Sequence, residues 1–174
     1  MIILGIDPGT ATTGWAVVAK GTREIKLLSY GVITTGKDEE SAQRLKKIYE
    51  EVIKIIKKYR IEEVSLEMIF FNTNAKTALD VGQASGVMKL AADKSKIPIF
   101  EYTPLQVKMA LTGYGRAEKS QIGKMVQQTF KLKSVPKPDD AADAVAISLT
   151  HCYSRKMSRR GVGIPTEASG KIGL

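Results

Sequence analysis

The sequence predicts an α/β domain of three layers, in which helices flank a central mixed sheet of five strands. Three β-prone segments come first along the chain, joined by short connections that are typical of an antiparallel meander. Two further β-prone segments then alternate with segments of helical periodicity. With 174 residues, of which 43% are hydrophobic, the chain is long enough for one compact domain with a sizeable core.

The first half of the domain contains most of the strands. Strands are expected over residues 2–7, 14–20 and 25–34, with a turn at 20–23. Apolar residues then recur at helical spacing from Leu45 to Tyr59, and Ser41 is a candidate cap for this helix. A fourth strand is expected over 64–67.

The second half is mainly helical. A helix over 75–94, small and apolar on much of its surface, precedes the last strand at 97–102. Thr103 and Pro104 open a short helix that the glycine-containing run 113–116 ends, and further helices are expected over 117–130 and 139–153. The chain shows no internal repeat, so one domain over residues 1–153 is predicted.

Residues 154–174 differ in kind from the rest. They contain Arg155, Lys156, Arg159 and Arg160, followed by glycine, proline and small polar residues with little periodicity. We expect a basic tail without fixed structure. It is either a solvated end or an arm that binds phosphates.

Asp7 is the first candidate functional residue, because it ends a buried strand and begins a tight turn. Pro8 prevents the strand from continuing, and Gly9 lets the backbone approach a ligand closely. A carboxylate held there can bind Mg²⁺ beside a phosphate, or can accept hydrogen bonds from the N–H groups of the turn.

Further acids follow at two places. Glu67 ends the fourth strand, while Asp140 and Asp143, spaced i, i+3, point to one side of the last helix. Asp139 is interpreted as a capping residue, whereas Asp143 lies inside the helix among alanines, where capping explains it poorly. Ionised acids packed together destabilise a fold unless a cation neutralises them, so the sequence predicts a divalent metal site.

The overall charge favours a polyanionic partner, since the formal net charge is +9 and the pI is near 9.6. Nucleic acid is favoured over a membrane, because no apolar stretch reaches ~18 residues. No secretory signal is expected, and a single cysteine suits a reducing cytoplasm. Cys152 and His151, the only histidine, are interpreted as structural because no second Cys or His could complete a site.

Basic residues gather in the stretch 104–133, which carries six of them against one acid, a local balance of +5. Such a stretch can be a merely solvated face, but its place before the acidic helix favours a surface that follows DNA phosphates. The six basic residues are Lys108, Arg116, Lys119, Lys124, Lys131 and Lys133.

Two aromatic residues, Phe70 and Phe71, follow directly after Glu67. An aromatic pair is by default part of a core, but a ring exposed beside a catalytic acid can wedge between bases at a branch point. From the residues alone, both roles stay open for Phe70 and Phe71.

Six segments of the chain, in this order, resemble the RuvC family of Holliday-junction resolvases. The resemblance covers residues 1 to about 153, and six motifs in order are far more specific than any one of them. The segments are the strand and turn at 2–15, the strand end at Glu67 with Phe70 and Phe71, and the runs 82–87, 106–108, 117–120 and 140–152.

The resemblance implies a ribonuclease-H-like fold and a Mg²⁺-dependent endonuclease that resolves four-way DNA junctions in recombination and repair. Some relatives carry a histidine where Asp140 stands. The resemblance also favours one of Phe70 and Phe71 as the wedge at the branch point, and we expect Lys76 among the DNA contacts. The catalytic and metal-binding acids fall on Asp7, Glu67, Asp140 and Asp143, and the basic active-site residues on Lys108 and Lys119.

The implied mechanism uses two Mg²⁺ ions ~3.5–4 Å apart, replaceable by Mn²⁺, one activating the water and one stabilising the leaving 3′ oxygen. The products are a 5′-phosphate and a 3′-hydroxyl, and the two lysines offset charge that develops in the transition state. The family also implies a homodimer, with its seam expected on the helix over 75–94, and a branch-migration motor of the RuvA and RuvB type.

Three other classes stay open. The turn at Asp7 also resembles the first phosphate loop of actin-like ATPases and sugar kinases, but 174 residues leave no room for their second domain. A non-catalytic junction-binding module would not need four carboxylates, which repel phosphate. The smaller YqgF-type resolvase-like nucleases are the nearest enzyme alternative.

Overall fold

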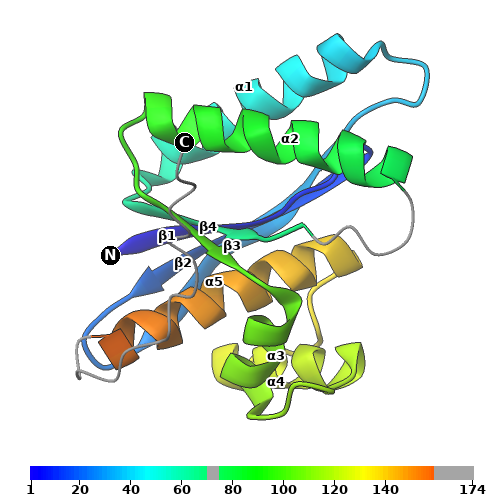
Figure 1. The fold of residues 1–174 in the computed structure, drawn as a ribbon. Helices are drawn as coiled ribbons and strands as arrows, with labels where there is room; N and C mark the ends of the chain where they lie inside the picture. Colours follow the sequence, from blue (N-terminus) through cyan, green and yellow to red (C-terminus); the bar gives the residue numbers. More distant parts are fainter. Residues whose placement is uncertain (70–74, 159–174) are drawn as a thin grey trace, which may run out of the picture.

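The computed structural model describes residues 1–69 and 75–158, and it shows one mixed five-stranded sheet between two layers of helices (Figure 1). The strand order is β3-β2-β1-β4-β5, in which β1 pairs antiparallel with β2 and parallel with β4. The predicted fold class is therefore confirmed. The strands are β1 (Ile2–Asp7), β2 (Thr12–Lys20), β3 (Ile25–Thr34), β4 (Glu63–Glu67) and β5 (Ile99–Tyr102).

The helices divide between the two faces of the sheet. Helices α1 (Ser41–Tyr59) and α2 (Ala75–Lys94) cover one face. Helix α5 (Asp139–Ser158) runs along the other face, with α3 (Pro104–Thr112) and α4 (Lys119–Phe130) packed beyond it (Figure 1). Each face has its own apolar core, because side chains of a strand alternate between the two faces.

Small residues let α5 lie close to the sheet. A Cβ atom on Gly5 would overlap the backbone oxygen of Ala144, and one on Gly14 would overlap that of Asp140. Ala141 and Ala144, both fully buried, supply the small surface on the helix side. This close approach fixes the N-terminal turns of α5 over the ends of β1 and β2.

Several boundaries differ from the prediction. β5 begins at Ile99 instead of residue 97, because Lys96 adopts a left-handed conformation with φ 57° and the Ile97 N–H bonds back to Ala92. Ser41 is the first residue of α1, not its cap. Helix α4 begins at Lys119, where Gln121 Oε1 accepts the N–H of Glu118 at 2.8 Å.

Helix α5 also differs, since it continues to Ser158 instead of ending at 153. Residues 154–158 contain neither glycine nor proline, so nothing in the sequence breaks the helix there. The remainder of the predicted tail, residues 159–174, lies outside the described residues.

Candidate active site

Asp7 and Glu67 end two neighbouring parallel strands. Ile6 pairs with Leu66 in the β1–β4 register, so the two acids follow at the same edge of the sheet. Alternation along β1 puts Asp7 on the face where Gly5 meets α5. The sheet therefore presents both carboxylates to the N-terminal part of α5.

The start of α5 supplies the other two acids. Gly14 is the register partner of Asp7 and lies directly against the backbone of Asp140. Asp143 follows one turn later, and its charge acts on both Asp7 and Glu67, whereas that of Asp140 acts on Asp7. All four predicted acids thus belong to one electrostatic cluster.

Lys119, the first residue of α4, reaches this cluster. Its Nζ donates a 2.8 Å hydrogen bond to Oδ2 of Asp143 and lies 3.7 Å from Oδ2 of Asp139. Asp139 itself pairs with Lys137 at 2.7 Å, at the exposed start of the helix. Asp139 is the first residue of α5 and not the residue before it, so it does not occupy the predicted cap position, although its charge still favours the helix start.

A cavity of about 210 Å³ lies beside the acids and lysines. Helices α3, α4 and α5 form its walls. Thr103 caps the start of α3, and its hydroxyl accepts the N–H of Gln106 at 3.1 Å. The cavity is lined by the charged residues Glu67, Lys108, Lys119 and Asp143 and by the apolar residues Pro104, Val107, Ile122, Ala146 and Ile147.

Burial dominates the electrostatics of the two strand-end acids. It raises the pKa of Asp7 to about 8, and the charges of Glu67, Asp143 and Asp140 and a hydrogen bond with Glu67 add to the rise. Burial likewise raises the pKa of Glu67, although its hydrogen bond with Asp7 and the charge of Lys119 oppose this. A proton shared between Asp7 and Glu67 relieves their repulsion.

Lys119 shows the opposite balance. Its partial burial would lower the pKa, but the hydrogen bond to Asp143 and the surrounding carboxylates outweigh burial and raise it. Lys119 therefore stays cationic throughout the physiological range.

The donor set fits a hard divalent cation. Carboxylate oxygens are the ligands that Mg²⁺ prefers, and a cation would replace the shared proton of Asp7 and Glu67. Within residues 1–69 and 75–158, no three acidic, His or Cys side chains already enclose a metal position.

The other predicted site residues fall outside the cavity or outside the described residues. Arg116 and Lys124 are exposed on the α3–α4 connection and on α4. Phe70 and Phe71 lie outside the described residues, and Lys76 belongs to α2 although its side chain is not described. Their predicted roles stay predictions.

The sequence did not reveal a buried polar network under the site. His151 is fully buried, with Nδ1 at 2.6 Å from the Tyr102 hydroxyl and Nε2 at 2.5 Å from Oε2 of Glu63. These contacts confirm that His151 is structural. One sequence feature could have indicated this network: polar residues alternate along β4, at Glu63, Ser65 and Glu67. Alternate residues of a strand share one face, and this face of β4 meets α5.

A sheet of this order, with strand-end acids facing acids at the start of a helix, defines a ribonuclease-H-like nuclease domain. The family described as "Crossover junction endodeoxyribonuclease RuvC" matches residues 3–151. The chain therefore belongs to the RuvC family. This membership decides against the kinase, non-catalytic and YqgF-type alternatives.

Two relatives and one solved structure illustrate the similarity. The chain is 48% identical to the RuvC of Halothermothrix orenii, over 92% of this chain and 97% of that protein. It is 51% identical to the RuvC of Alkaliphilus oremlandii, over 88% and 94%. The structure of Thermus thermophilus RuvC in complex with a Holliday junction substrate matches with a TM-score of 0.85 and 37% identity, covering 93% of this chain and 97% of that one.

A helix that crosses a bilayer needs about 20 consecutive, predominantly apolar residues. In the described part of the chain, no helix is both long enough and apolar enough to cross a membrane.

Proposed function

We propose that this chain is a structure-specific endonuclease that resolves four-way DNA junctions by metal-dependent hydrolysis of phosphodiesters. The observation that carries the proposal is the cavity in which Glu67, Lys108, Lys119 and Asp143 meet beside the buried carboxyl of Asp7. Relatives named as crossover junction endodeoxyribonucleases, and a solved relative with bound junction, support the same activity. The role belongs to recombination and repair, in the cytoplasm.

Four side chains, Asp7, Glu67, Asp140 and Asp143, would hold the metal ions. We assign two Mg²⁺ ions, with Mn²⁺ as a substitute, because the donors are all carboxylate oxygens. When bound, these ions supply an activated water and stabilise the leaving 3′ oxygen, so that a 5′-phosphate and a 3′-hydroxyl result. The buried position of Asp7 makes it the central ligand.

The lysines of the cavity act on the substrate. Lys108 lines the cavity from α3, and Lys119 lines it from α4. Their ammonium groups would lie near the scissile phosphate and stabilise negative charge that grows in the transition state. On substrate binding, the Lys119 ammonium would share its hydrogen bonds between Asp143 and that phosphate.

Further DNA contacts extend outward from the cavity. Exposed Arg116 and Lys124 supply positive charge close to α3 and α4, where junction arms would pass. We assign Lys76 and the basic residues after 154 to backbone contacts as well, and one of Phe70 and Phe71 to the branch point.

The surface of α2 supports the assignment of a homodimer. Leu79 and Leu90 are 62% and 49% exposed, and a Cβ at Gly82 or Gly86 would meet open space. Apolar side chains beside flat glycine surface are typical of a helix that packs against a partner helix. Two-fold symmetry would place two active sites on a two-fold symmetric junction, where a motor of the RuvA and RuvB type delivers the substrate.

The experiment that tests the proposal compares two DNA substrates of the same sequence. Wild-type protein with Mg²⁺ should nick a synthetic four-way junction at symmetric positions and leave a linear duplex largely intact. Equal cleavage of both substrates would contradict junction specificity. Cleavage of neither would contradict the nuclease activity itself.

A further inference from the structure

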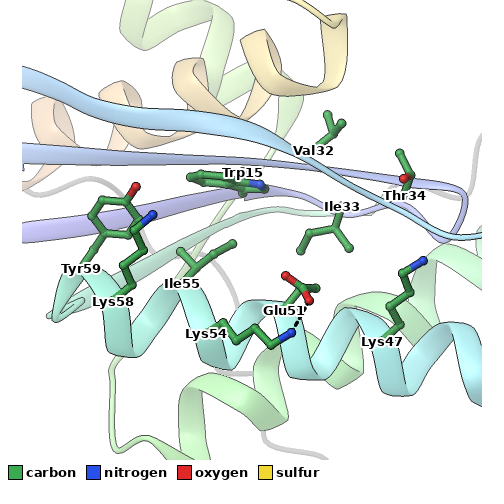
Figure 2. A pocket seen from close by; sticks show the side chains of 10 residues that line it. All are labelled: Trp15, Val32, Ile33, Thr34, Lys47, Glu51, Lys54, Ile55, Lys58 and Tyr59. Atoms are coloured by element: carbon green, nitrogen blue, oxygen red, sulfur yellow. Dashed lines mark hydrogen bonds and ion pairs between the residues drawn. The ribbon is translucent and has the colours of Figure 1, made fainter.

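A second cavity, of about 380 Å³, lies on the opposite face of the sheet from the active site, between α1 and strands β2 and β3 (Figure 2). Its floor is apolar and aromatic: Trp15 and Ile33 come from the strands, and Ile55 and Tyr59 from α1. The rings of Trp15 and Tyr59 have centroids 6.5 Å apart at a tilt of 42°. Nothing in the nuclease mechanism uses these residues.

The cavity exists because of one register pair. Trp15 lies opposite Gly31 in the β2–β3 register, and a Cβ on Gly31 would lie 3.0 Å from the indole ring. The indole ring thus packs against a position of β3 that has no side chain. A partly exposed tryptophan on the floor of a hollow is a frequent anchor point in protein interfaces.

The rim of the cavity is basic. Lys47, Lys54 and Lys58 project from α1 around the opening, and Glu51 is the acid among the lining residues (Figure 2). Lys47 also lies 3.6 Å from Glu39, which is not part of the lining. Glu51 pairs with Lys54 at 2.6 Å, and the Nζ atom of Lys58 lies 5.1 Å from the centre of the Tyr59 ring. The lining therefore keeps a positive balance over an apolar floor.

Strand β3 adds a third feature. It is the outermost strand of the sheet, and Val32, Ile33 and Thr34 from it line the cavity. In the described part of the chain no further strand pairs with its outer side. An edge strand can accept an extended segment through main-chain hydrogen bonds.

We infer that this cavity is a docking site for an extended acidic peptide of a partner protein, which inserts one large apolar side chain against Trp15. The apolar floor would bury the large side chain of the peptide, and the lysines of the rim would pair with carboxylates beside it. The edge strand β3 would form main-chain hydrogen bonds with the extended backbone of the peptide. Duplex DNA fits less well, because it has phosphates for the rim but no apolar group that projects into a hollow. Residues 154–174 of this chain carry five basic residues against Glu167, so charge disfavours them as the occupant.

Selection from a phage library of random dodecapeptides tests this inference on the full-length protein. Peptides with one large apolar residue flanked by at least two acids should be enriched. The Lys54→Glu/Lys58→Glu variant should bind them at least tenfold more weakly, whereas the matched variant Lys46→Glu/Lys57→Glu, on the same helix but outside the cavity, should bind them nearly as well as wild type. Trp15 is the only tryptophan, so bound peptide should shift its emission.

Other outcomes would overturn the inference. These are enrichment of no such peptides, equal binding by the cavity and control variants, or binding that leaves the Trp15 emission unchanged. A larger loss of junction affinity in the cavity variant than in the control would assign the lysines to DNA. A changed oligomeric mass would assign the surface to a second copy. Both variants should keep the wild-type melting temperature and nicking rate, which separates this site from the nuclease activity.

Discussion

The 2.8 Å hydrogen bond from Lys119 Nζ to Asp143 Oδ2 joins the first turn of α4 to the acidic start of α5. It brings a permanent cation to the edge of a cluster whose central member, Asp7, is held by burial in a partly protonated state. The site thus combines acids that need a cation with a lysine placed to act on a phosphate. The predictions below separate these two roles.

Replacing Lys119 by alanine should slow the chemical step. Its ammonium is placed to stabilise charge that grows only in the transition state, so the single-turnover nicking rate at saturating enzyme should fall by an order of magnitude or more. Lys124→Ala is the matched control on the same helix and should lower affinity with little effect on that rate. An unchanged saturated rate for Lys119→Ala would remove it from catalysis.

Removing the chain after Ser158 should weaken binding and not chemistry. Because α5 continues to Ser158, this truncation keeps the helix intact and deletes Arg159 and Arg160. Each lost phosphate contact should reduce the slope of log K against log salt by ~0.9. The measurement is junction binding in Ca²⁺ across a salt series. A truncated protein with a slower nicking rate at saturating enzyme and unchanged affinity would contradict this prediction.

The acids should differ in importance. Asp143 acts on both Asp7 and Glu67 and binds Lys119, whereas Asp140 is the weakest of the charges acting on Asp7. Asp143→Asn and Glu67→Gln should therefore abolish nicking, and Asp140→Asn should retain more activity. Nicking rates with Mg²⁺ and with Mn²⁺ check this order, and full activity of Asp143→Asn would remove α5 from the site.

The stability of the metal-free protein should depend on the Asp7 carboxyl. Its pKa rises from 3.8 to about 8 on folding, so the contribution of this group is fully present below pH 4 and is lost as the pH rises to about 8. Asp7→Asn should consequently gain stability over wild type as the pH increases, by a few kcal/mol at most. Urea unfolding of both proteins at pH 5 and pH 8, without and with Mg²⁺, measures this difference.

Mg²⁺ should offset this loss of stability at high pH in the wild type but not in Asp7→Asn, since a bound cation favours the ionised carboxylates. A stability difference between wild type and Asp7→Asn that stays constant from pH 5 to pH 8 would contradict the burial of Asp7. Equal stabilisation of both proteins by Mg²⁺ would contradict Asp7 as a ligand.

Much of this site could be predicted from the sequence because its acids lie at strand and helix ends. Asp7 ends an apolar run, Glu67 ends a β-prone run and Asp143 lies among alanines, so local pattern alone marked them. The lysines were different: only the resemblance to a family singled out Lys108 and Lys119. Their approach depends on how α3 and α4 pack on α5, which no local pattern encodes.

Other features depend on pairing between distant segments. The raised pKa of Asp7 needs the burial that Gly14 and α5 create, and the hollow over Trp15 needs Gly31 as its register partner. The network of Glu63, Tyr102 and His151 joins two strands and a helix. The extension of α5 past 153 is also hard to predict, because a basic segment before glycine and proline is typical of a tail, whereas arginine and lysine also favour helices.

The most direct test of the central claim is to measure nicking and binding of one four-way junction by the Asp7→Asn variant. Nicking with Mg²⁺ should be lost, while affinity for the junction in Ca²⁺ should equal or exceed that of wild type, because the substitution removes a metal-binding charge and no phosphate contact. Nicking by this variant at the wild-type rate would contradict a metal site centred on Asp7. Loss of binding in parallel with nicking would instead make Asp7 a structural residue of the turn.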